Sequence, residues 1–207
     1  KQYAQSWGFN VICCDPPRQE RENLDFVTLE QLLPQTDILT LHTPLDNTTR
    51  TMINDRTLSL LRPNAVVINA SRGEVVETAA LLRSGLECAI DVWENEPEID
   101  VSLLNKVYIA TPHIAGYSAE GKLNATRIVL ESFAKFVNFK KPLPSLSLPP
   151  LREPVCAASM PEALLSIYSP LNDSEKLKAN PSMFEHLRNN SPLRREPASY
   201  TLVLNDK

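Results

Sequence analysis

Three polar groups in this chain stand after apolar runs and could together carry acid–base chemistry on a small molecule. His113 follows one such run, Val107 to Ala110, and Arg72 follows another. The stretch 91–98 supplies four carboxylates. A carboxylate beside an imidazole raises its basicity and fixes its tautomer, so such a histidine can take a proton from an alcohol. The planar fork of Arg72 can hold a substrate carboxylate through two hydrogen bonds, and the adjacent Gly73 lets a ligand approach the backbone.

Each of these groups also has a plainer interpretation. An isolated histidine is more often a satisfied structural residue, and the acidic stretch could be a solvated turn. Arg72 could be a surface charge at a strand end, although the neighbouring glycine argues against it. Two other histidines are weaker candidates, because His42 ends an apolar run and His186 lies in a helix-compatible stretch.

Asp15 indicates a nucleotide cofactor. It follows the apolar run Phe9 to Cys14, where a carboxylate can accept both hydroxyls of an adenosine ribose and would repel a 2′-phosphate, which favours NAD over NADP. A helix-capping or turn aspartate is the alternative. A glycine-rich phosphate loop is expected about 20 residues earlier, which lies before Lys1. We therefore expect the chain to be the C-terminal part of a longer protein.

The elements that would position these groups alternate between strand and helix. Short apolar runs, continuous enough for strands covered on both faces, predict five strands at residues 9–14, 38–42, 65–70, 88–92 and 107–110. Helix-compatible stretches lie at residues 28–33, 55–61, 75–82 and 101–105. Ser118 could cap a further helix to about Val137. The fold class is therefore α/β, a Rossmann-type doubly wound parallel sheet whose first strand and glycine-rich loop are missing from this chain, with ligands at the carboxyl ends of the strands.

A proline-rich stretch interrupts this pattern, because six prolines fall within residues 142–161 and forbid a regular helix or central strand. We predict a nucleotide-binding domain at 1–140, a connection at 141–160 and a small C-terminal α+β domain at 161–207. In the last domain, short helices are expected at 161–168, 173–178 and 181–190, and a strand at 200–204. About 45 residues bury little surface alone, so this tail should pack on the main domain or on another copy of the chain.

Composition excludes several classes of protein. Hydrophobic residues make up 43% and charged residues 22% of the 207 positions, and no apolar run approaches the ~18 residues of a membrane span. The net charge of −4 includes no basic stripe, so neither a nucleic-acid nor a membrane partner is expected. The four cysteines lack the spacing of a metal site. Reduced thiols and the absence of a signal-peptide pattern predict a cytoplasmic protein without metal.

With these residues in hand, the sequence resembles the D-isomer-specific 2-hydroxyacid dehydrogenases, which are NAD-dependent enzymes. The resemblance rests on four segments in family order: His42-Thr43-Pro44-Leu45, Val67 to Gly73, Asp91 to Pro97 and Thr111 to Gly116. It implies that Arg72 binds the substrate carboxylate and polarises the C2 oxygen, that His113 is the acid/base and that Glu96 is its paired carboxylate. It also implies an NAD pocket lined by Asp15, Thr43, Ala70, Ser71, Asp91 and Gly116.

Within the family, three features resemble the branch that oxidises 4-phospho-D-erythronate in pyridoxal 5′-phosphate biosynthesis. They are Cys14 to Arg18 at the ribose position, Gly116 to Lys122, and the tail with Leu187 to Asn190 and Pro192 to Glu196. The resemblance implies that Tyr117 contacts a phosphorylated hydroxyacid substrate and that the tail is a dimerisation domain, hence a homodimer.

Two departures keep other functions open. The segments 44–55 and 76–91 are shorter than in typical members of this branch and of the family. Another D-2-hydroxyacid dehydrogenase, for example one acting on 3-phosphoglycerate, therefore remains an alternative. An NAD(H)-sensing binding protein similar to the C-terminal-binding corepressors is the alternative from another class, and it would bind peptide with little turnover.

Overall fold

The computed structural model describes residues 1–22, 26–151 and 153–204. The chain divides into two units, Lys1–Ile109 and Ala110–Lys207. This division falls within the predicted nucleotide-binding domain, and the domain boundaries at 140 and 160 remain predictions.

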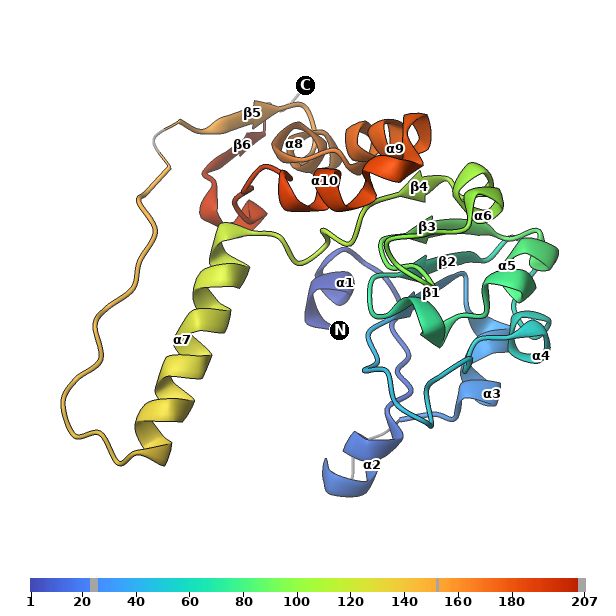
Figure 1. Ribbon diagram of the computed structural model, residues 1–207, viewed down its shortest axis with the longest axis horizontal. Helices are drawn as coiled ribbons and strands as arrows, with labels where there is room; N and C mark the ends of the chain where they lie inside the picture. The colour runs from blue at the N-terminus through green and yellow to red at the C-terminus, as the bar shows by residue number, and fades with distance from the viewer. Residues whose placement is uncertain (23–25, 152, 205–207) are drawn as a thin grey trace. The chain divides into compact units, whose positions relative to one another are not determined.

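A four-stranded sheet organises the first unit (Figure 1). Its strands are β1 (Ile38–Leu41), β2 (Val66–Asn69), β3 (Glu87–Ile90) and β4 (Ile109–Ala110), in the spatial order β1-β2-β3-β4. β1 and β3 both run parallel to β2, with Leu39 opposite Val67 and Val67 opposite Cys88. When parallel strands lie side by side in sequence order, right-handed crossovers put the connecting helices on one face of the sheet. The predicted parallel α/β sheet is confirmed.

The strand predicted at residues 9–14 is wrong. The segment forms no strand with any other described residues, and two backbone bonds tie it to neighbouring segments, from Phe9 N to Ala4 O at 3.1 Å and from Val27 N to Cys13 O at 3.0 Å. A strand needs a neighbour that supplies a ladder of such bonds, and an apolar run does not by itself provide one.

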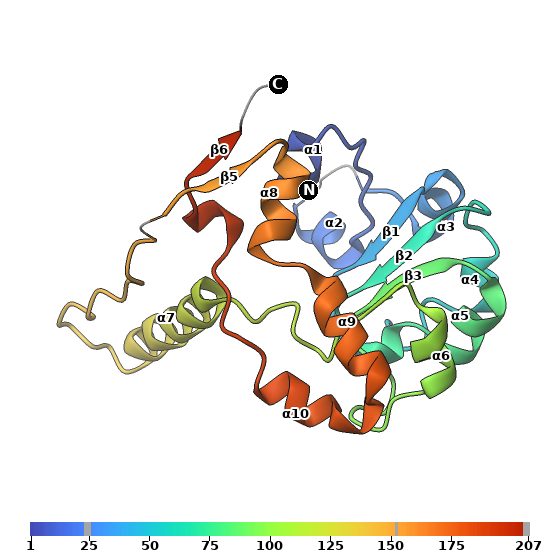
Figure 2. The same cartoon turned by 90° about the horizontal axis from the view of Figure 1, so that it is seen from above.

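Short helices flank the sheet of the first unit. Their bounds are α1 (Gln2–Ser6), α2 (Pro16–Glu22), α3 (Leu29–Leu32), α4 (Asp55–Leu58), α5 (Thr78–Ser84) and α6 (Val101–Lys106), with 3-10 turns at Leu33–Gln35 and Gly73–Val75. Thr28 and Asn54 each begin a helix with a reciprocal capping box, and Asp100 caps α6 by accepting from Leu103 N. The helices α4, α5 and α6 lie beside one another along the sheet (Figure 2).

The core of the first unit comes from alternate strand positions. Leu39 and Leu41 of β1 are buried while Ile38 is 45% exposed, and β2 and β3 alternate in the same way. The described strands are therefore fully buried on one face only, whereas the continuous apolar runs predicted burial on both. Apolar composition alone does not show whether a face of a sheet is covered or partly exposed to solvent.

The second unit holds one long helix and a small α+β group. Its elements are α7 (Ala119–Phe136), β5 (Val155–Ala157), α8 (Met160–Ile167), α9 (Pro170–Ala179), α10 (Phe184–Asn189) and β6 (Leu202–Leu204), with 3-10 turns at Pro181–Met183 and Pro197–Ser199. The predicted tail helices and strand are present. β5 pairs in parallel with β6 and was missed, because its three residues lie inside the proline-rich stretch.

The tail of the second unit is fixed to the start of α7. Ser118 caps this helix, as predicted, by accepting from Gly121 N at 2.9 Å. Glu120 accepts hydrogen bonds from the side chains of Arg195 and Ser199 and from Glu196 N. Partial burial alone would raise the pKa of Glu120, but these donors lower it to about 2.

No helix of the described residues is long and apolar enough to cross a membrane.

Replacing Glu120 with Gln should reduce stability in a pH-dependent way. Because the pKa of Glu120 is below its ordinary value in the folded protein, its stabilisation is complete above pH 4.5 and is lost as the pH falls toward 2. Urea unfolding should therefore show a clear difference between E120Q and the parent protein at pH 7 and a smaller one at pH 3. A difference of constant size at both pH values would contradict this assignment. Glu131→Gln, on the same helix, is the matched control.

Candidate functional site

The loop that follows β2 is organised by a buried amide. Asn69 is 1% exposed, and its Oδ1 accepts from the backbone N of Ser71 at 3.1 Å and from its hydroxyl at 2.8 Å. Its Nδ2 donates to Arg72 O at 2.9 Å. Sequence reasoning assigned no role to Asn69, although a polar residue ending an apolar strand was a visible signal. The amide thus fixes the backbone that carries Ser71 and Arg72.

Arg72 extends from this fixed backbone into an exposed position. Its Nη1 donates to Ser71 O at 2.6 Å, which holds one side of the guanidinium against its own loop. The fork retains further N–H donors. A guanidinium that is held at one nitrogen and keeps other donors available suits the binding of an anion such as a carboxylate.

Gly73 brings the loops after β2 and β3 together. It is buried, and a Cβ added to it would overlap the backbone of Trp93 and Glu94. Only a residue without a side chain permits this contact. The close approach joins the loop of Arg72 to the acidic stretch, two segments that the sequence places about twenty residues apart.

The carboxylates of the acidic stretch separate into different environments. Asp91 is 6% exposed at the end of β3, and Trp93 beside it is 3% exposed. Glu94 accepts from Thr78 N at 2.9 Å and so serves the start of α5. Glu96 accepts from Trp93 N at 2.8 Å. Thus Glu94 is engaged by a helix terminus, whereas Glu96 is held within its own turn.

Residues predicted to line an NAD pocket are compatible with a bound nucleotide. The hydroxyl of Thr43 is buried and has no hydrogen-bond partner among the described residues. Buried polar atoms of this kind call for a ligand or an ordered water. Ala70 is exposed at the end of β2 beside buried Ser71. Asp15 is half-buried and accepts from Arg18 N at 3.1 Å through Oδ1, so the capping role considered as its alternative is present.

His113 lies in the loop after β4, in the second unit, and has an uncommon backbone conformation. Its φ of 57° lies in the left-handed region, which costs a non-glycine residue of the order of 1–3 kcal/mol and persists only where neighbouring contacts enforce it. Its side chain is half-buried. Such outliers cluster at functional sites, so this geometry supports the choice of His113 over the other histidines.

The residues after His113 form a tight turn. Tyr117 N donates to Ile114 O at 2.9 Å, and Ser118 N donates to Gly116 O at 3.0 Å. Ala115 and Gly116 are exposed at the tip, while Ile114 is 1% exposed. Lys122 Nζ lies 4.4 Å from the centre of the Tyr117 ring, a cation–π contact that orients the ring.

The predicted site residues are divided between the two units. Arg72, Glu96 and five of the six NAD-pocket candidates belong to the first unit, and His113, Gly116 and Tyr117 belong to the second. Their catalytic and binding roles remain predictions. His42 is exposed, and its Nε2 lies 3.0 Å from Thr40 Oγ1.

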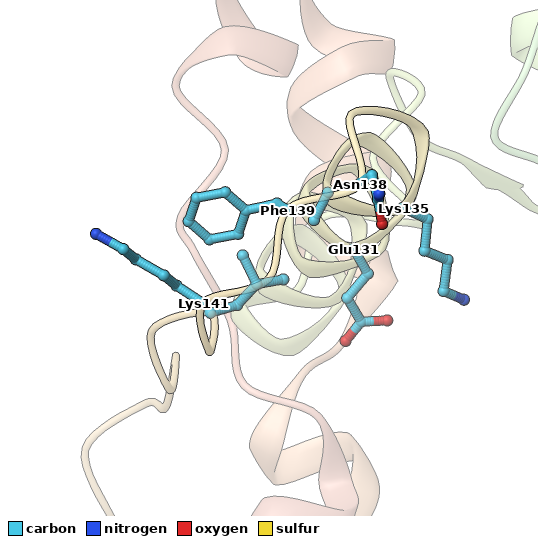
Figure 3. Close-up of a pocket in the computed structure, with 7 residues that line it drawn as sticks. Glu131, Lys135, Asn138, Phe139 and Lys141 are labelled. Atoms are coloured by element: carbon cyan, nitrogen blue, oxygen red, sulfur yellow. The ribbon is translucent and has the colours of Figure 1, made fainter.

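Two open hollows lie away from these residues. One, of about 430 Å³, lies at the C-terminal end of α7, where Glu131, Lys135 and Phe139 border it (Figure 3). The other, of about 540 Å³, lies between α4 and α5. No predicted site residue lines either hollow. Among residues 1–22, 26–151 and 153–204, no cluster of histidine, cysteine and carboxylate side chains could hold a metal ion.

Comparison with known proteins identifies relatives of the chain. Residues 1–115 match the family model of the D-isomer specific 2-hydroxyacid dehydrogenase NAD binding domain. The chain is 43% identical over 210 residues to erythronate-4-phosphate dehydrogenase of Bacteroides thetaiotaomicron, covering 97% of this chain and 60% of the relative. It is 38% identical over 217 residues to the enzyme of that name from Proteus mirabilis, covering 95% and 58%. The chain thus spans about three-fifths of the length of these relatives.

A solved structure supports the fold and the cofactor. D-isomer specific 2-hydroxyacid dehydrogenase from Lactobacillus delbrueckii ssp. bulgaricus, in an NAD complexed form, superposes with a TM-score of 0.57 at 26% identity, covering 68% of this chain and 50% of that one. Together with the matched NAD binding domain, this confirms the predictions of a Rossmann-type domain and of NAD as its cofactor.

Gly73→Ala should destabilise the first unit, because the added methyl group overlaps the backbone of Trp93 and Glu94. Overpacking of this kind costs about 1–3 kcal/mol, measurable as a shift of the urea midpoint. Gly116→Ala is the matched control for stability, since a Cβ there meets nothing within 4 Å. Equal unfolding free energies for the two variants would contradict the close approach of the loops.

Proposed function

The chain belongs to the D-isomer specific 2-hydroxyacid dehydrogenases, and on that premise we propose that it serves the NAD-dependent oxidation of 4-phospho-D-erythronate. The product is 3-hydroxy-2-oxo-4-phosphonooxybutanoate, and the reaction belongs to pyridoxal 5′-phosphate biosynthesis. The observation that carries the substrate is the 43% identity to erythronate-4-phosphate dehydrogenase over 97% of this chain. This similarity includes the tail, which extends beyond the matched NAD binding domain.

Three residues carry the chemistry in this proposal. When bound, NAD supplies the acceptor for the hydride that leaves C2 of the substrate. His113 removes the proton of the C2 hydroxyl, and Glu96 favours the resulting imidazolium. Arg72 holds the substrate carboxylate and offsets negative charge on the C2 oxygen. The bond from its Nη1 to Ser71 O supports a fixed position for this guanidinium.

The remaining predicted residues bind the cofactor and substrate in this proposal. Asp15 accepts from the adenosine ribose, while Thr43, Ala70, Ser71, Asp91 and Gly116 line the NAD pocket. The unpartnered hydroxyl of Thr43 supports this assignment most directly. Tyr117 contacts the substrate, and its cation–π neighbour Lys122 holds the ring in place.

The substrate is tested by following NADH absorbance with the full-length protein. We expect turnover with 4-phospho-D-erythronate to exceed that with D-3-phosphoglycerate or D-lactate by at least tenfold in kcat/KM. Preference for either of the other acids would overturn the proposed substrate while leaving the reaction type intact. NADH binding without turnover on any of them would favour the binding-protein alternative.

His113→Asn should lower kcat for oxidation by about 10²- to 10⁴-fold, the usual contribution of a general base. The matched control is His42→Asn, at an exposed histidine bonded to Thr40, which should retain turnover. Turnover of H113N close to the parent level would refute the assignment.

Arg72→Ala should raise KM for the hydroxyacid and lower kcat, because the guanidinium contacts both the carboxylate and the oxygen on which charge develops. Arg72→Lys should recover only part of the loss, since an ammonium cannot form the paired hydrogen bonds of the fork. Kinetics of both variants over a range of substrate concentrations test this role. Unchanged KM and kcat in R72A would remove Arg72 from the site.

We also infer that the protein forms a homodimer through α7. Of the 18 residues of this helix only Ala119 is buried, and an apolar stripe with Val129, Phe133 and Phe136 stays 61–87% exposed. The spacing of four and three residues puts these side chains on one face. A second copy of the chain is the proposed occupant, because the same stripe on two copies is self-complementary and closed twofold dimers are the commonest assemblies.

Phe133→Asp should weaken this dimer, measured as a shift from dimer to monomer in sedimentation velocity. The matched control is Tyr108→Asp, at a residue of the first unit that is 65% exposed and lies outside the stripe. A dimer unaffected by F133D, or a monomeric parent protein, would exclude α7 as the interface.

A cytoplasmic location fits the thiols of the chain. The four cysteines are free, which suits a reducing compartment. Burial raises the pKa of Cys88 to about 11 and also raises that of Cys14, so these two thiols stay protonated and unreactive at neutral pH.

A further inference from the structure

The turn after His113 is held by a residue from the distant tail. Arg194 Nη2 donates to Ile114 O at 2.7 Å and to Ala115 O at 2.8 Å. The bonded residues are separated by about eighty positions in the chain but belong to the same unit. Hydrogen bonds from a charged donor are stronger than neutral ones. One guanidinium therefore restrains the carbonyl groups of the two residues that follow His113.

The guanidinium also lies against an aromatic ring. Its central carbon lies 4.2 Å from the centre of the Tyr168 ring, a stacked cation–π arrangement. The Tyr168 hydroxyl in turn donates to Asp173 at 3.0 Å. The ring thus restrains the guanidinium whose Nη2 bonds the turn, while Nη1 is buried with no hydrogen-bond partner among the described residues.

The backbone around Arg194 is docked on the start of α7. Arg194 O accepts from Ala119 N at 2.8 Å, and the two segments form an isolated parallel bridge between Ser118 and Arg194. Ser118 Oγ donates to Glu196 at 2.7 Å. The turn from His113 to Ser118 is therefore bonded to the tail near both of its ends, by the side chain of Arg194 at one end and by its backbone at the other.

His113 needs such restraint, because its φ of 57° persists only where neighbouring contacts enforce it. Small displacements of a catalytic group reduce the rate strongly, since productive geometry is narrow. We propose that Arg194 is a positioning residue for His113, holding the turn in the conformation that presents the imidazole to the substrate. This inference rests on the proposed role of His113 as the acid/base. Arg194 acts through the backbone of residues 114 and 115.

The tail offers a matched control in the next residue. Arg195 donates to Glu120 and, through Nη1, to Pro149 O at 2.9 Å, but has no bond to the turn among the described contacts. Arg194→Ala and Arg195→Ala each remove a guanidinium that helps dock the tail. Only the former removes the bonds to the carbonyls of Ile114 and Ala115.

The kinetic test uses the full-length protein with NAD and 4-phospho-D-erythronate. R194A should lower kcat by about 10- to 100-fold with KM within about threefold of the parent, whereas R195A should keep kcat within about threefold. Added guanidinium chloride at low millimolar concentration should restore part of the kcat of R194A and none in R195A. Equal losses of kcat in both variants, or unchanged kcat in R194A, would overturn the positioning role.

A second measurement separates this inference from the proposed function. Amide hydrogen exchange in the NAD-free protein should accelerate at Tyr117 and Ser118 in R194A by at least tenfold, and should stay near the parent rate in R195A. Accelerated exchange in R194A with an inactive parent protein would mean that the proposed substrate is wrong while the restraint is real. Unaltered exchange in R194A would refute the restraint, whatever the activity.

Discussion

The close contact between Gly73 and the backbone at Trp93 is the constraint on which the first unit's part of the site depends. Parallel strands deliver their loops to one edge of a sheet, but an edge alone does not define the separation between two loops. The missing side chain at residue 73 allows the loop after β2 to touch the loop after β3. Asn69 then fixes the direction in which Arg72 leaves that contact. The loop of Arg72 and the acidic turn thereby share one rigid support.

The second unit uses a different device for the same purpose. The turn after His113 is not held by a close contact between two loops. His113 itself has a left-handed backbone conformation that needs support from other residues. The tail supplies it through Arg194 at the turn and through Arg195 and Ser199 at Glu120. The tail of about 45 residues thus supports the turn after His113 within its own chain, in addition to the dimerisation that the sequence resemblance predicts for it.

Sequence reasoning could select candidate site residues because strand ends are visible as polar residues that follow apolar runs. The residues alone did not distinguish the roles of the carboxylates in the acidic stretch, since Glu94 and Glu96 have the same chemistry and similar neighbours. Glu94 is occupied by the start of α5 through Thr78 N, a contact sixteen residues away along the chain. The strand expected at residues 9–14 failed for a related reason: its apolar residues are present, but a ladder partner is a property of the assembled sheet.

The sequence by itself determined the parallel α/β pattern, the capped start of α7 and NAD as the cofactor, and it supplied the candidates for a hydroxyacid site. These features follow from local periodicity and from the chemistry of single side chains. Both are properties of a segment's own sequence and do not depend on where the segment lies in the fold. Only the tertiary structure decided that Asn69 organises the loop of Arg72, that β5 pairs with β6 and that Arg194 binds the carbonyls after His113. Those contacts join residues through space, and their hydrogen bonds depend on distances and directions that no local pattern encodes.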